Sequence, residues 1–155
     1  MNPADVPFAD LYRKVIMEHY REPAHRGKLD EPSVVAEGHN PLCGDDVRLE
    51  LKIETGRVVQ AAFTGDGCAI SMASTSMLTD LLEGRTIEES LELIERFTRF
   101  IKGDRDGIDE HELGDLAALE GVSRFPVRIK CALLPFVSVK NVIAVNRTNG
   151  VAPSS

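Results

Sequence analysis

The chain has 155 residues, a net charge of −7 at pH 7 and only three cysteines, which is about one domain's worth of sequence with enough residues to bury its own core. The acidic excess disfavours general nucleic-acid binding, which needs a basic surface, and no apolar run is long enough to span a membrane. An odd cysteine count argues against a disulfide framework, and we expect no signal segment, because Asp5, Asp10 and Arg13 interrupt the N-terminal stretch. We therefore expect a single domain over residues 1–155 in the cytoplasm, where thiols stay reduced, without nucleic-acid or membrane partners.

The first half of the chain predicts one helix followed by three strands. Apolar side chains recur at helical spacing over residues 8–20, which indicates an amphipathic helix. A short strand is expected over 34–37 and a second over 47–53, where apolar and charged residues alternate so that one face of the strand should meet water. A two-residue turn then leads to a third strand over 57–63, so the strands should form an antiparallel meander.

Helices dominate the second half. Residues 69–82 carry an apolar stripe and end before Gly84, and Thr86 with Glu89 forms the capping box of a third helix that should end at Gly103. The expected fold class is α+β, with a small three-stranded antiparallel sheet packed by helices on one face.

The stretch between the third and last helices is harder to assign. Its first part, residues 102–113, is polar and predicts a surface loop, and 115–120 could form a short helical piece. The last helix is expected over 134–146, with Pro135 in its first turn, where proline is tolerated. From about residue 148 we expect an irregular tail.

The three cysteines lie where a packed core does not require them. Cys43 is in a glycine-containing loop before a strand, Cys68 opens a helix after Gly65-Asp66-Gly67, and Cys131 is expected just before or within the first turn of the last helix. A lone cysteine is more often a buried space-filling residue. Three thiols at the ends of three elements, however, can converge on one point, and a helix N-terminus favours a thiolate.

A nearby carboxylate completes a plausible metal site. Asp45 is two residues from Cys43 across a glycine, so both side chains can turn toward one ion, and three sulfurs with one oxygen suit a tetrahedral metal. Asp46 is the alternative, but its side chain should point to the opposite face if the strand begins there. The chain has four histidines, which are not expected to cluster; they are His19, His25, His39 and His111.

Four motifs follow one another along the chain: His19-Tyr20-x-x-Pro23-x-His25-Arg26-Gly27, Asn40-Pro41-x-Cys43-Gly44-Asp45, Gly65-x-Gly67-Cys68-Ala69-Ile70-Ser71 and Lys130-Cys131-Ala132-Leu133. They resemble those of the NifU N-terminal/IscU superfamily of sulfur and iron–sulfur assembly proteins. The resemblance covers roughly residues 11–145 and includes a polar stretch over 103–123 that looks like an insertion of the SufU branch. The scaffold branch typically has histidine immediately before the third cysteine, where this chain has Lys130.

This resemblance implies a zinc ion bound by Cys43, Asp45, Cys68 and Cys131, with Cys43 as the sulfur acceptor. It also implies two kinds of partner: a cysteine desulfurase, which is a pyridoxal-phosphate enzyme like SufS, and downstream iron–sulfur assembly proteins. The chain would then be a zinc-dependent sulfurtransferase that transfers persulfide sulfur and has no independent turnover. One alternative is a scaffold on which a [2Fe–2S] cluster is assembled. The other is a zinc-stabilised binding module without transfer chemistry.

Overall fold

The protein is built on a three-stranded antiparallel sheet in the order β1-β2-β3. A computed structural model describes residues 6–42 and 44–151, and describes side chains from residue 14 to residue 145 apart from Cys43. Thr55 and Gly56 join the last two strands, and both have a positive φ, of 53° and 72°, as tight hairpin turns require. The strands are β1 (Val34–Asn40), β2 (Asp45–Glu54) and β3 (Arg57–Asp66).

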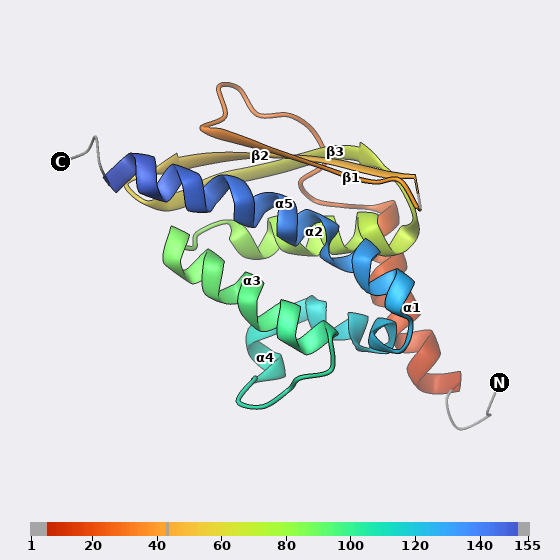
Figure 1. Cartoon of the computed structure of the whole chain (residues 1–155). Helices are drawn as coiled ribbons and strands as arrows, with labels where there is room; N and C mark the ends of the chain where they lie inside the picture. The colour runs from red at the N-terminus through yellow and green to blue at the C-terminus, as the bar shows by residue number, and fades with distance from the viewer. Residues whose placement is uncertain (1–5, 43, 152–155) are drawn as a thin grey trace.

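The helices cover one face of this sheet, as Figure 1 shows. Within the described residues, α5 packs along β1 and α2 packs against β3. Outside these two helices lie α3, which contacts α5, and η2, which contacts both α5 and α2. The expected α+β class is confirmed. The helical elements are α1 (Val6–Arg21), α2 (Ala69–Leu82), α3 (Ile87–Ile101), α4 (Glu110–Leu113), the 3-10 helix η2 (Gly114–Arg124) and α5 (Pro126–Val151).

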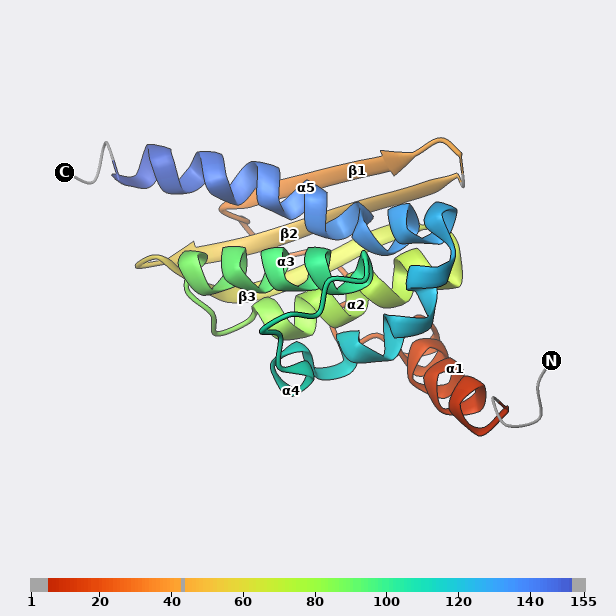
Figure 2. The same ribbon diagram turned by 60° about the horizontal axis from the view of Figure 1, so that its bottom comes forward.

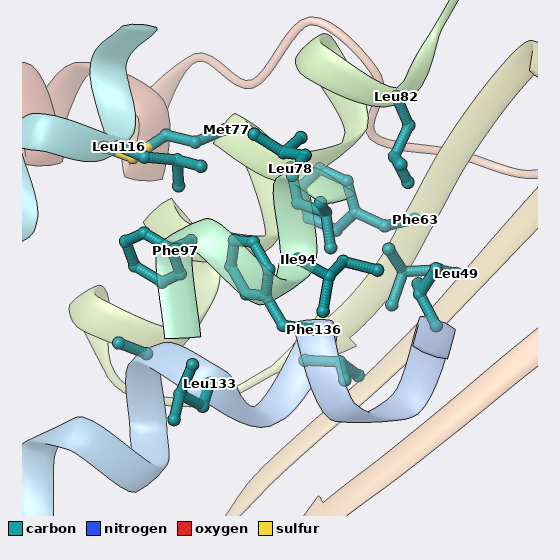
Figure 3. Close-up of a cluster of buried hydrophobic side chains, with 14 of the residues drawn as sticks. Leu49, Phe63, Met77, Leu78, Leu82, Ile94, Phe97, Leu116, Leu133 and Phe136 are labelled. Atoms are coloured by element: carbon teal, nitrogen blue, oxygen red, sulfur yellow. The ribbon is translucent and has the colours of Figure 1, made fainter. Parts of the chain in front are cut away.

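The core lies between the sheet and the two helical layers (Figure 3). The rings of Phe97 on α3 and Phe136 on α5 stack with their centroids 4.4 Å apart. On the sheet, Leu49 of β2 is paired with Phe63 of β3, and both side chains are fully buried. Burying a large apolar side chain removes apolar surface from water, and each such burial stabilises the folded state by roughly 1.5–3 kcal/mol.

The opposite face of the sheet is partly covered by residues 22–33, which we call the strap. Figure 1 shows this segment above the sheet, on the side away from the helices. Gly27 N donates to Phe63 O at 2.8 Å, and Leu29 N donates to Glu50 Oε1 at 2.8 Å. Glu50 is only 4% exposed as a result. The expectation that the charged face of this strand meets water is therefore wrong at Glu50, because a distant segment folds over it.

Local sequence signals predicted most helix boundaries correctly. Helix α2 has the expected bounds, and the capping box of α3 is present, with Glu89 N donating to Thr86 Oγ1 at 3.1 Å and Thr86 N to Glu89 Oε1 at 2.9 Å. The polar stretch 102–113 is a loop only in part, since its last four residues form α4 after the N-cap Asp109. The expected helical piece over 115–120 lies within η2.

The last helix was predicted wrongly at both ends. It begins at Pro126 instead of near Leu134, and it continues to Val151 instead of ending near residue 146. Pro126 occupies the first helical position, where its fixed φ is favourable and its missing N–H costs nothing. Pro135 lies inside the helix, where it removes one backbone hydrogen bond without ending the helix.

Candidate metal centre

Asp45 is the first residue of β2 and pairs with Asn40 at the end of β1. Its side chain shares the buried face of the strand with Val47 and Leu49 because side chains alternate along a strand. The carboxylate is 0% exposed, and Oδ1 accepts a hydrogen bond from Cys68 N at 2.8 Å. Asp45 is thereby directed toward the start of α2.

Asp46 points the other way, as its register predicts. Its side chain is 65% exposed and forms an ion pair with His39 on β1. The structure therefore separates the two neighbouring aspartates, and of the two it is Asp45 that faces Cys68 and Cys131.

Cys68 is the N-cap residue of α2 and lies where the sequence predicts. Its Sγ accepts a hydrogen bond from Ser71 N at 3.4 Å, one of the free N–H groups of the first helical turn. The Ser71 hydroxyl lies 3.7 Å from the same sulfur. The hydroxyl itself donates to Cys68 O at 3.1 Å, so the Ser71 group that donates to the sulfur is the backbone N–H.

Cys131 lies in the second turn of α5, not at its N-terminus. The helix begins at Pro126, so the expected stabilisation of this thiolate by a helix end does not apply. The residue is 0% exposed. Its Sγ lies 3.7 Å from Val127 O and 4.0 Å from Asn40 Nδ2.

Three of the expected ligands converge. The candidate ligand atoms of Asp45, Cys68 and Cys131 all lie within 4.8 Å of one another, with Cys68 Sγ 3.9 Å from Asp45 Oδ2. They come from β2, α2 and α5, and in Figure 2 the starts of α2 and α5 lie together with the beginning of β2 at one end of the molecule. Two thiols and a carboxylate at such distances can bind one metal ion.

The fourth expected ligand, Cys43, lies outside the described residues. Its neighbours in the chain are described: Leu42 is 73% exposed, and Gly44 has a φ of +69°. Gly44 N donates to Asn40 O at 2.9 Å, which closes the connection between β1 and β2.

A groove of about 570 Å³ opens beside Cys68. The groove is lined by Ile16 and Met17 of α1, by Phe125 just before α5 and by Arg128 in the first turn of α5. Phe125 is 60% exposed, and within the described part of the chain Arg128 takes part in no salt bridge. The mouth of the site therefore offers apolar contacts next to a cation.

Two histidines come together, contrary to the expectation from the sequence. His25 Nδ1 lies 2.7 Å from Asp80 Oδ1, and His19 Nδ1 lies 3.9 Å from Asp80 Oδ2. His25 also contacts Glu83 through Nε2 at 2.9 Å. The spacing of Asp80 and Glu83 on one face of a helix was the signal available in the sequence. These contacts hold α1 and the turn after it against α2, away from the three converging ligands.

Comparison with known proteins shows the family. Residues 11–132 match the family model described as the NifU-like N terminal domain. The chain belongs to this family. Among the members of known name, the zinc-dependent sulfurtransferase SufU of Bacillus subtilis is 44% identical over 134 residues, which is 86% of this chain and 90% of SufU. The resemblance inferred from the four motifs is thereby confirmed.

Other members of the NifU-like family are named as scaffold proteins. The iron–sulfur cluster assembly scaffold protein IscU of Streptococcus pyogenes is 39% identical over 133 residues, covering 86% of this chain and 82% of the relative. A crystal structure from Fervidobacterium islandicum, named as an iron–sulfur cluster assembly scaffold protein for the SUF system, has a TM-score of 0.77 at 33% identity and covers 82% of this chain and 92% of that one. Both of these proteins are thus named for iron–sulfur cluster assembly. Among the described residues, no helix is both long enough and apolar enough to cross a bilayer.

Proposed function

We propose that this protein is a zinc-dependent sulfurtransferase of iron–sulfur cluster assembly. It accepts persulfide sulfur from a cysteine desulfurase and passes the sulfur to the assembly machinery. The observation that carries the proposal is the convergence of Asp45, Cys68 and Cys131 within 4.8 Å, beside the loop that contains Cys43. The 44% identity to a zinc-dependent sulfurtransferase supports the same function.

Cys43, Asp45, Cys68 and Cys131 would bind the zinc. Three thiolates and one carboxylate match the ligands that zinc accepts in tetrahedral sites. Bound zinc keeps thiolates deprotonated at neutral pH and shares their charge, which restrains their reactivity. The burial of Asp45 and Cys131 excludes water from two sides of the site.

Cys43 is the proposed sulfur acceptor. Cys131 is fully buried, and Cys68 is held at the start of α2 by Ser71 N. Cys43 instead follows the exposed Leu42, which a partner can approach.

The transfer itself needs no oxidant. The Cys43 thiolate attacks the terminal sulfur of the desulfurase persulfide, so one sulfur–sulfur bond forms as another breaks. The desulfurase cysteine leaves as a thiolate, and Cys43 carries the persulfide.

The desulfurase would dock over the groove beside Cys68. Its contacts would include α1, through Ile16 and Met17, and the start of α5, through Phe125 and Arg128. An exposed aromatic side chain next to an arginine is typical of the central part of a protein interface. We expect the partner to present apolar and acidic side chains to this surface.

Replacing Cys43 by serine tests the acceptor role. We expect Cys43→Ser to abolish stimulation of alanine release by a cysteine desulfurase, because serine cannot form a persulfide. Binding to the desulfurase should persist within a few-fold, since the docking surface is wider than one residue. Both quantities are measured with the same preparations, by an alanine assay and by titration.

Leu42→Ser is the matched control, because it introduces the same residue at the neighbouring exposed position. It should retain stimulation. Full stimulation by Cys43→Ser would instead move the acceptor role to another thiol.

A further inference from the structure

Asn40, the last residue of β1, uses three polar groups in hydrogen bonds to the neighbouring loop and to Cys131 while being only 8% exposed. Its backbone O accepts from Gly44 N at 2.9 Å, and its Oδ1 accepts from Leu42 N at 3.2 Å. Its Nδ2 donates to Cys131 Sγ at 4.0 Å. Through its backbone and its side chain together, this one residue connects the loop on both sides of Cys43 to a cysteine on α5.

The orientation of the Asn40 amide follows from its partners. Leu42 N can only donate a hydrogen bond, so the amide oxygen must face it, and the NH₂ group then faces the sulfur of Cys131. A hydrogen bond to a negatively charged sulfur is stronger than one to a neutral thiol. Because the contact is buried, water does not compete for it.

The two described cysteines differ in how their sulfurs are supported. Cys68 Sγ receives a backbone N–H from Ser71 at the start of α2. Cys131 Sγ, in the second turn of α5, donates to Val127 O of its own helix at 3.7 Å and accepts from Asn40 Nδ2 at 4.0 Å. The donor to Cys131 that faces it from another element is therefore a side-chain amide, whereas the donor to Cys68 is a backbone N–H.

We infer that Asn40 is a positioning residue of the metal centre, which fixes the Cys43 loop with its carbonyl groups and supports the Cys131 thiolate with its amide N–H. The inference rests on the proposed zinc site. Groups that hydrogen-bond metal ligands commonly change metal affinity by 10–100-fold when they are removed. Asn40 touches two of the four proposed ligand segments, so both its affinity effect and its effect on the sulfur should be measurable.

Two variants separate the two roles. Asn40→Ala removes both side-chain bonds, and we expect its zinc affinity, measured by competition with a chelator, to fall about 10–100-fold. Asn40→Asp has nearly the same shape and keeps an oxygen for Leu42 N, but it loses the donor to Cys131. With cobalt in place of zinc, the sulfur-to-cobalt charge-transfer band should move to lower energy in both variants, because the thiolate has lost a hydrogen bond.

Asn141→Asp is the matched control, since it makes the same change at an exposed position far along α5. It should leave affinity and band position unchanged. If Asn40 only fixes the loop, Asn40→Asp will keep the wild-type band, and the inference is overturned. Should Asn40→Ala prove unfolded, the cobalt spectrum of Asn40→Asp decides alone. A wild-type protein that binds neither zinc nor cobalt would overturn the proposed function as well, whereas normal wild-type binding with unaltered variants would overturn only the role of Asn40.

Discussion

Gly67 determines how closely the start of α2 can approach β2. A Cβ atom at this position would lie 2.6 Å from Asp45 Oδ1 and 2.7 Å from Ser71 Oγ. Both distances are shorter than real contacts allow, so a larger residue would displace the aspartate from Cys68. At the scale of single residues, the candidate centre therefore depends on glycine at position 67, which has no Cβ, as much as on the side chains that form the site.

The thiols of Cys68 and Cys131 lead to a prediction about stability at this scale. We expect Cys68→Ala and Cys131→Ala to lose zinc and to melt on the order of 10 °C lower than the zinc-bound protein, because zinc binding stabilises only the folded state. The metal-free domain should remain folded, since its core of sheet and helices does not include the metal. Differential scanning calorimetry measures both effects.

Wild-type protein treated with a chelator is the control and should melt near the temperature of the variants. Identical melting curves with and without chelator would contradict the first part of this prediction. Loss of all cooperative melting in the metal-free protein would contradict the second part.

At the scale of elements, the position of α5 depends on two prolines. Both Pro126 and Pro135 are compatible with the first turn of a helix, so the sequence alone could not choose between them. The choice is made by packing, since Leu133 and Phe136 belong to the buried core together with Cys131. Cys131 consequently faces inward from a helical turn instead of opening the helix.

The strap makes stability depend on pH through Glu50. The hydrogen bond from Leu29 N, followed by that from Arg48, lowers the pKa of Glu50 below its ordinary value of 4.5 despite its burial. The unfolded chain lacks these bonds. The stabilisation is therefore present above about pH 4.5 and is lost as the pH falls through the lower pKa of the folded state.

We expect Glu50→Gln to lower the free energy of unfolding by about 1–2 kcal/mol at pH 7, because it replaces a charged hydrogen-bond acceptor by a neutral one. The difference from wild type should shrink as the pH falls below the ordinary glutamate pKa. Urea titrations across this range measure it. Glu54→Gln, at the exposed end of β2, is the control and should change little. A constant difference at every pH would show that Glu50 acts through packing instead of charge.

At the scale of the whole molecule, the sequence predicted what local patterns determine. Alternation and capping located the three strands, α2 and the start of α3, because these signals lie within a few neighbouring residues. Two features could not be predicted, because each depends on segments that are distant in the chain. Residues 22–33 cover Glu50, and His19 and His25 both lie beside Asp80.

The candidate centre divides in the same way. The sequence singled out the cysteines and Asp45 by their positions near element ends, and the structure brings Asp45, Cys68 and Cys131 together. It could not reveal the contact from Asn40 to Cys131, which joins residues 91 positions apart. Their roles as zinc ligands, and that of Cys43, remain proposals for experiment.

Metal analysis of the purified full chain tests the central claim most directly. We predict one zinc per chain, with sulfur neighbours at about 2.3 Å by X-ray absorption, and neither iron nor acid-labile sulfide. Protein that carries iron and sulfide in equal amounts with visible absorption, or that holds no metal at all, would contradict the account.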